Sequence, residues 1–273
     1  GIQIIDPKQS NPFGFNGQIF ALDYEEMRET QASFELMAAY LNGSTVNATI
    51  DGNPQRYTGA YITPDFFRIL GVRPVKGRDF AEADNKPGAE KTTIISHQLW
   101  QRDFGSDPNV LGKGIVLNGK PASVIGVMPP GFAFPGNEQL WVPLYSEFPP
   151  VPRNDLRRVP PSVLGLIKPG VSLEQATSEF TSIAQRLAAA FPDTNKQFNT
   201  ALIQPLIKAF TPKAIQGLLW TMLAFCVGIL LIACVNVMNM QFARAALRAK
   251  ELAVRSSLGA TRARLLRQMQ AGP

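Results

Sequence analysis

Short blocks of apolar residues, separated by polar or turn-forming residues, run through the first 210 residues of the chain. The segments 36–41, 44–50 and 54–62 lie between turn residues and have alternating apolar positions, so they predict strands. The polar block 23–31 predicts a short helix with Asp23 as its N-cap. This first part of the chain therefore reads as a mixture of strands and short helices.

Cap and turn signals punctuate the next hundred residues. Thr63 and Gly71 bracket a predicted short helix, with the threonine as N-cap and the glycine as the left-handed stop. Ser96 is the predicted N-cap of a helix over 97–105. Asn118 and Gly119 stand between two β-rich runs and predict a two-residue hairpin.

The last third of this region continues the pattern. Residues 162–170 predict a strand, and residues 172–192 an amphipathic helix with a capping box between Ser172 and Gln175. Residues 201–207 predict a closing strand. Because most of the pairing reads as local hairpins, we expect an α+β fold rather than a doubly wound α/β sheet.

A different pattern begins after Lys213. The 30 residues from 214 to 243 carry no charge, and their apolar centre, 218–237, is long enough to cross a bilayer as a helix. The alternative is a core helix of a soluble protein, which rarely runs so far without a charge. We therefore predict a transmembrane helix over 214–243.

The charges of the chain are unevenly distributed. Seven bases and one acid after residue 240 account for the whole net charge of +6, so residues 1–240 are neutral and nucleic-acid binding by that part is excluded. By the positive-inside rule, residues 244–273 are cytoplasmic and residues 1–212 periplasmic or extracellular. A translocated domain needs an earlier signal or membrane helix, which the opening GIQIIDPKQS does not supply.

Two asparagines interrupt the predicted membrane helix near its cytoplasmic end. Asn236 and Asn239 share a face and are costly to expose to lipid, so we expect them to pack against another helix. The alternative is solvation at headgroup level. Cys226 and Cys234, the only cysteines, are about 12 Å apart along a helix and cannot pair with each other.

Catalytic and cofactor signals are weak. His97 is the only histidine, so no catalytic triad or multi-histidine metal site can be built, and we interpret it as a surface or packing residue. Gly112-Lys113 lacks the rest of a Walker A motif. Asp79, Glu82 and Asp84 match no calcium-loop pattern, so we expect solvated carboxylates. The sequence predicts no catalytic, metal or cofactor site.

The basic tail predicts a second kind of site. Arg244, Arg248, Glu251 and Arg255 form a charged stripe on a helix that we expect to end at Gly259. Thr261 then caps a second basic helix. Such a pair of helices under the membrane could dock on a protein partner or rest on anionic lipid.

Several strings in the chain resemble one known family. RAKELAVRSSLGATRARLLRQ (248–268) resembles the cytoplasmic signature after the second membrane helix of FtsX-like and MacB-like permeases. The blocks at 63–80, 116–135 and 140–144 resemble the MacB-like extracytoplasmic core domain. The sequence of these blocks is closest to the duplicated-permease branch that has no fused ATPase. The resemblance covers nearly the whole chain.

The resemblance implies a specific organisation. The core domain, 1–210, should contain a porter-like unit (about 1–60 and 159–210) and an inserted β-rich unit (about 61–158), followed by the membrane helix and a truncated coupling segment. It implies a permease subunit of an ABC export or mechanotransmission system, without an active site of its own. Movement of the outer domain would be driven by a separate cytoplasmic ABC ATPase.

Partners follow from the same resemblance. The site residues for the ATPase would be Arg248, Glu251, Arg255, Gly259 and Thr261. A homodimer or paired permease halves, membrane lipid, and a periplasmic adaptor or outer partner are also implied. The rival interpretation is an extracytoplasmic signalling module that activates an outer partner, such as a cell-wall hydrolase, without transport.

Overall fold

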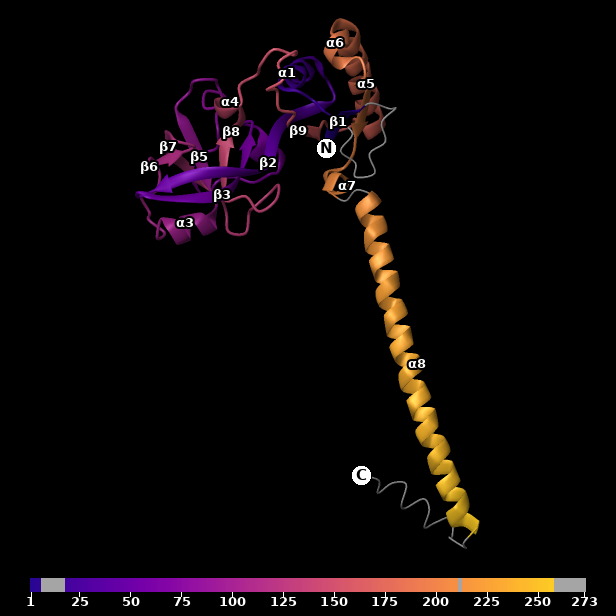
Figure 1. The fold of residues 1–273 in the computed structure, drawn as a ribbon. Helices are drawn as coiled ribbons and strands as arrows, with labels where there is room; N and C mark the ends of the chain where they lie inside the picture. Colours follow the sequence, from indigo (N-terminus) through magenta and orange to yellow (C-terminus); the bar gives the residue numbers. More distant parts are fainter. Residues whose placement is uncertain (6–17, 211–212, 258–273) are drawn as a thin grey trace. The chain divides into compact units, whose positions relative to one another are not determined.

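A computed structural model describes residues 1–5, 18–210 and 213–257. The chain forms two compact units, Gly1–Pro212 and Lys213–Pro273. The first unit contains every described strand and seven helices, and the described part of the second is a single long helix (Figure 1).

One mixed sheet organises the first unit. Its strands are β1 (Ile2–Ile5), β2 (Phe34–Ile50), β3 (Asn53–Ile62), β4 (Lys76–Gly77), β5 (Lys91–Ile95), β6 (Gly114–Leu117), β7 (Lys120–Val127), β8 (Leu140–Pro143), β9 (Ser162–Ile167) and β10 (Thr200–Ile203). Their order is β10-β1-β9-β2-β3-β8-β5-β7-β4, and β6 pairs with β2 and β7. Only β3 with β8 and β5 with β7 are parallel among the described pairs, so the sheet is that of an α+β domain.

Helices lie on and around this sheet. They are α1 (Ala21–Thr30), α2 (Phe66–Ile69), α3 (His97–Asp103), α4 (Leu144–Glu147), α5 (Leu173–Ala190), α6 (Pro192–Asn195) and α7 (Leu206–Phe210). The second unit holds α8 (Lys213–Ser257). The apolar stripe of α5 enters the larger core, where Phe180 meets Phe34 of β2 edge-on at 5.2 Å between ring centroids. A smaller core gathers Phe66 and Phe67 of α2 around Trp141 of β8.

The second strand is longer than the sequence pattern predicts. Residues 36–41 and 44–50, predicted as separate strands, belong to one strand of 17 residues, β2. The register shifts between Leu41 and Ser44, where Gly43 has φ +64. A bulge of this kind lets a strand continue past an extra residue, so the Gly that looked like a turn bends the strand instead.

Several local predictions are confirmed. The Ser96 hydroxyl accepts a hydrogen bond from Leu99 N, and Ser172 and Gln175 form the complete capping box of α5. Asn118 and Gly119 both have positive φ and connect β6 to β7, as a type I′ hairpin requires. Gly71 has φ +68 after α2. His97 packs edge-on against Trp100.

Other predictions are wrong because distant partners intervene. Helix α1 begins before Asp23, which is 5% exposed and accepts from Arg153 instead of capping. The Thr63 hydroxyl accepts from Ala39 N of β2 and leaves α2 without a side-chain cap. Asp84 is not a solvated carboxylate, since it is 9% exposed and accepts two hydrogen bonds from Arg78. The predicted closing strand ends at Ile203, and α7 follows.

Candidate functional site

The second unit provides the first part of the candidate site. Helix α8 is 45 residues long. Within its stretch Gln216–Lys250, the most apolar 18 residues have a mean hydropathy of 2.7, and none of them is buried. A bilayer core needs about 20 apolar residues in a helix. Among the described residues α8 is the one helix long and apolar enough to cross a membrane.

Small residues form a shallow groove along one side of α8. Thr221, Ala224 and Gly228 line it together with larger apolar side chains. Gly228 and Asn239 are 11 positions apart, which is about three helical turns, so the polar Asn239 continues the same side. Small residues let helices approach closely in membranes. The packing of Asn236 and Asn239 against another helix stays a prediction.

The basic end of α8 carries part of the predicted coupling site. The helix continues without a break through Ser257 and includes Arg248, Glu251 and Arg255. The Arg248 side chain is exposed. Gly259 and Thr261, predicted to form an elbow and a second cap, lie outside the described residues.

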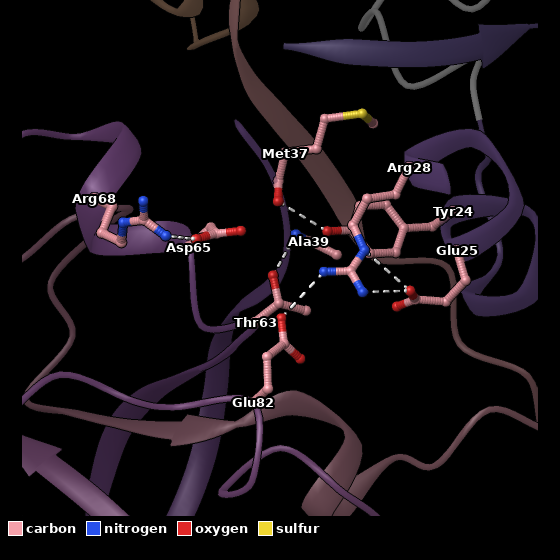
Figure 2. A network of polar contacts seen from close by, with 9 residues as sticks. All are labelled: Tyr24, Glu25, Arg28, Met37, Ala39, Thr63, Asp65, Arg68 and Glu82. Atoms are coloured by element: carbon pink, nitrogen blue, oxygen red, sulfur yellow. Dashed lines mark hydrogen bonds and ion pairs between the residues drawn. The ribbon is translucent and has the colours of Figure 1, made fainter. Parts of the chain in front are cut away.

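A polar network in the first unit provides a second part that the sequence analysis missed. Figure 2 shows Arg28 of α1 at its centre, between Glu25 on the same helix and Glu82 from the loop before β5. The Arg28 guanidinium donates from Nε to Glu25 at 3.1 Å and from Nη1 to Glu82 at 3.2 Å. This arginine therefore ties α1 to a loop 54 residues away in sequence.

Beneath this arginine, Tyr24 anchors α1 to the sheet. Its hydroxyl donates to the Met37 carbonyl at 3.0 Å, and the ring is 1% exposed (Figure 2). Burial raises the pKa of the Tyr24 hydroxyl well above its usual range, so the group stays a neutral donor. Thr63, at the end of β3, accepts from Ala39 N at 2.9 Å on the neighbouring strand.

A second arginine holds α1 from its other side. Arg153, in the loop after α4, donates to Asp23 at 2.9 Å and to Glu26 at 3.0 Å. Its guanidinium also lies over the Phe191 ring, 3.7 Å from the ring centroid, at the end of α5. Asp23 is largely buried, so removing Arg153 would leave an unpaired carboxylate, which is costly. Helix α1 is thus fixed to three separate chain segments.

Within the described ranges, no group of three or more His, Cys, Asp or Glu side chains could hold a metal ion. The arginines of the α1 network are each paired with carboxylates. The contacts of this network join α1 to β2, to the loop before β5 and to the loop after α4.

A family model for the MacB-like periplasmic core domain matches residues 2–183, which is more than half of the chain. An α+β domain that matches this model is followed in the chain by a helix long and apolar enough to cross a membrane. The chain belongs to the family of the MacB-like periplasmic core domain.

Two curated relatives extend this similarity beyond the domain. The macrolide export ATP-binding/permease protein MacB of Burkholderia thailandensis is 24% identical over 248 residues, 90% of this chain and 35% of the relative. The pyoverdine export ATP-binding/permease protein PvdT of Pseudomonas syringae pv. tomato is 25% identical over 211 residues, 74% of this chain and 30% of the relative. The chain spans about a third of the length of these relatives.

A solved structure matches the fold. The periplasmic region of MacB from Actinobacillus actinomycetemcomitans superposes with a TM-score of 0.52 at 15% sequence identity, covering 74% of this chain and 86% of that one. At this identity the match establishes a shared fold. The predicted MacB-like fold of the outer domain is therefore confirmed.

Proposed function

We propose that this chain is a transmembrane subunit of an ABC export or mechanotransmission system. In this proposal a separate cytoplasmic ATPase hydrolyses ATP, and the chain converts that event into movement of the periplasmic domain. Residues 1–212 lie in the periplasm and residues 244–273 in the cytoplasm of a bacterial inner membrane. The chain itself catalyses no reaction.

The continuity of α8 is the observation that carries the proposal. One helix runs from Lys213, at the start of the second unit, through the apolar stretch to Ser257 in the basic tail. At 1.5 Å per residue it is about 68 Å long. An unbroken helix of this kind passes a displacement of one end to the other, because every turn is hydrogen-bonded to the next.

Charge supports the proposed direction. The basic tail lies at the carboxyl end of α8, and residues before the apolar stretch are neutral overall. Arg248, Glu251 and Arg255 occupy successive turns of the helix, where they would meet the ATPase. Gly259 and Thr261 would set the angle of the following helix, since a left-handed backbone there favours glycine.

The proposed division of the domain has its own support. A porter-like unit (about 1–60 and 159–210) would hold β1, β2, β9 and β10, and β9 lies between β1 and β2 in the sheet. The inserted unit (about 61–158) would hold strands β4 to β8. The ion pairs Arg28–Glu82 and Arg153–Asp23 would then connect the porter-like unit to the inserted unit. A homodimer or paired permease halves would complete the assembly, with an adaptor at the periplasmic end.

Co-purification of the ATPase tests the coupling site. Glu251→Lys makes the stripe wholly positive and should lower recovery of an ABC ATPase, identified in native membranes by its Walker A peptide. Gly259→Val should lower it too, because a β-branched residue strains a left-handed turn. Ala253→Lys is the matched control, since it adds a cation about 200° around the same helix.

The outcomes separate partner docking from lipid anchoring. A lipid anchor would bind at least as well with the added positive charge of Glu251→Lys. Undiminished ATPase recovery in both Glu251→Lys and Gly259→Val, with normal membrane insertion, would overturn the proposed coupling site. Equal losses in Glu251→Lys and Ala253→Lys would also contradict it.

Helix continuity has a test of its own. Ala246→Pro removes a helical hydrogen bond between the apolar stretch and the tail, at a cost of about 3 kcal/mol to that helix. We expect ATP-dependent changes in the labelling of Ser106→Cys to disappear, while the ATPase still co-purifies. Ala246→Leu keeps the helix and should keep the changes.

A further inference from the structure

A cavity beside α1 has a lining that the proposed coupling does not use. Its volume is about 230 Å³, and it opens between the start of α1, the end of α4 and the loop that follows. Apolar side chains form most of its wall, among them Phe20, Leu41, Phe148 and Val151.

Four charged side chains line the same cavity, and three of them are already paired. Glu147 forms an ion pair with Lys91. Arg153 is held by Asp23 and Glu26, and the exposed Arg157 by Asp155 at 2.6 Å.

The fourth charged side chain, Arg158, is different. Among the residues the structure describes, no carboxylate pairs with it. Its guanidinium lies over the Phe20 ring, 3.8 Å from the ring centroid. The ring covers one face of the guanidinium, so the N–H groups along the guanidinium edge remain available as donors. The Arg158 Nη1 atom is shielded from water and has no hydrogen-bond partner in the described chain. A shielded, unpaired N–H of a cation is costly unless a ligand accepts from it.

A second donor meets the cavity at Tyr145. The residue is 7% exposed, and its hydroxyl is shielded from water without a hydrogen bond to any described group. The Glu25 carboxylate lies close to this hydroxyl, outside ordinary hydrogen-bond geometry. Burial first, and that carboxylate second, raise the pKa of Tyr145 far above its usual range, so its hydroxyl keeps its proton.

From this lining we propose that the cavity is a binding site for a small apolar monocarboxylate. The carboxylate accepts from Arg158 and from Tyr145, and the apolar body fills the space between Phe20, Leu41 and Phe148. Arg158 is the one charged side chain of this lining without a counter-charge among the described residues. A single such cation favours a ligand with one negative charge, because a second charge would be buried unpaired. This proposal is independent of the ATPase coupling proposed above.

A titration with a matched pair of probes tests the site. The full chain in lipid nanodiscs is titrated with 4-fluorophenylacetate and with 4-fluorophenylacetamide, followed by ¹⁹F NMR against empty nanodiscs. The two probes share size and apolar body and differ in charge. We expect saturable binding of the carboxylate, about tenfold tighter than the amide.

Adjacent arginines supply the matched variants. Arg158→Gln should weaken carboxylate binding about tenfold and leave the amide unchanged, whereas Arg157→Gln should change either by less than about twofold because Asp155 already compensates its charge. Tyr145→Phe keeps the ring and should weaken carboxylate binding about threefold. If Arg158→Gln does not fold, Tyr145→Phe and the probe pair decide.

Three results would overturn the site. These are carboxylate binding no greater than to empty nanodiscs at millimolar concentration, equal affinity for the two probes, or equal losses in folded Arg157→Gln and Arg158→Gln. An unaltered affinity in folded Tyr145→Phe would remove the hydroxyl from the site and overturn the two-donor arrangement.

Discussion

The MacB-like domain (residues 1–212) and α8 are both rich in apolar side chains, but they place them in opposite ways. In the domain Phe180 is 0% exposed, packed among side chains of the sheet and of α5. On α8 Phe225 is 73% exposed, and most of its apolar neighbours on the helix are also exposed. The domain supplies its own apolar environment, whereas α8 needs one from lipid or from other helices. The two regions are therefore stabilised by different surroundings, and the same substitution should act differently in each.

The largest expected difference is in topology. In a background where Cys226 and Cys234 are replaced by alanine, Ser106→Cys should react fully with a membrane-impermeant maleimide in cells with a permeable outer membrane. Ser256→Cys should react only after lysis, because the proposed topology places the basic tail in the cytoplasm. Labelling of Ser256→Cys in intact cells would reverse the orientation.

Truncating one buried ring should be the next largest effect. Phe180→Ala should lower the free energy of unfolding of residues 1–212 by about 3–5 kcal/mol, because it removes a ring from a filled core. Near-UV circular dichroism in a urea titration measures it. Phe225→Ala in the full chain should leave the unfolding of the domain unchanged. A loss below about 1 kcal/mol for Phe180→Ala would contradict the packing described for α5.

Two glycines sharpen the comparison further. A Cβ at Gly165 of β9 would lie 2.5 Å from Phe34 Cδ1, whereas one at Gly228 of α8 meets nothing within 4 Å. Gly165→Ala should cost about 1–3 kcal/mol of unfolding free energy through overpacking. Gly228→Ala should not destabilise α8 itself. Adding Phe34→Leu to Gly165→Ala should recover part of the loss, and full additivity of the two would argue against the contact.

The smallest effect depends on pH. Burial raises the pKa of Asp79 to about 6, so between pH 4 and 6 the folded domain binds more protons at this carboxyl than the unfolded chain does. Stability from this group therefore falls as pH rises through that window. Asp79→Asn should stabilise residues 1–212 at pH 7 by about 1 kcal/mol and give no gain near pH 4. Thermal unfolding at both pH values measures it.

A control of opposite sign is available at Asp155. Arg157 lowers the pKa of this carboxyl to about 2, so the charged form is the favoured one. Asp155→Asn should show no gain in stability at pH 7. A gain of equal size in both variants would mean that general charge removal, rather than burial of Asp79, is responsible.

Local signals predicted the local structure well. The caps at Ser96 and Ser172 and the Asn118–Gly119 hairpin depend on residues a few positions apart, and all are present. Asp23 and Thr63 failed as caps because their partners are far away in sequence, 130 positions for Arg153 and 24 for Ala39. A propensity for capping cannot compete with a buried ion pair or a strand-to-strand hydrogen bond.

The candidate site was predictable to an unequal degree. The charge asymmetry and the uncharged stretch indicated α8 and its basic end, since both are properties of composition. The α1 network was not predicted, although Glu25 and Arg28 already have the i, i+3 spacing of a helical ion pair. Its other partner, Glu82, comes from a loop whose position only the fold defines. The cavity with Arg158 is hidden for the same reason.

The bulge in β2 bears on how the domain can deform. This strand pairs with β9 at one end and with β3 and β6 farther along. One continuous strand therefore joins the two halves of the sheet. Its register is interrupted between Leu41 and Ser44, and there the Glu138 carboxylate accepts from Gly43 N at 3.2 Å. Bending of β2 would concentrate at this bulge, and the hydrogen bond from Gly43 to Glu138 restrains it. A load applied at the β9 end of β2 would therefore be taken up first at this bulge.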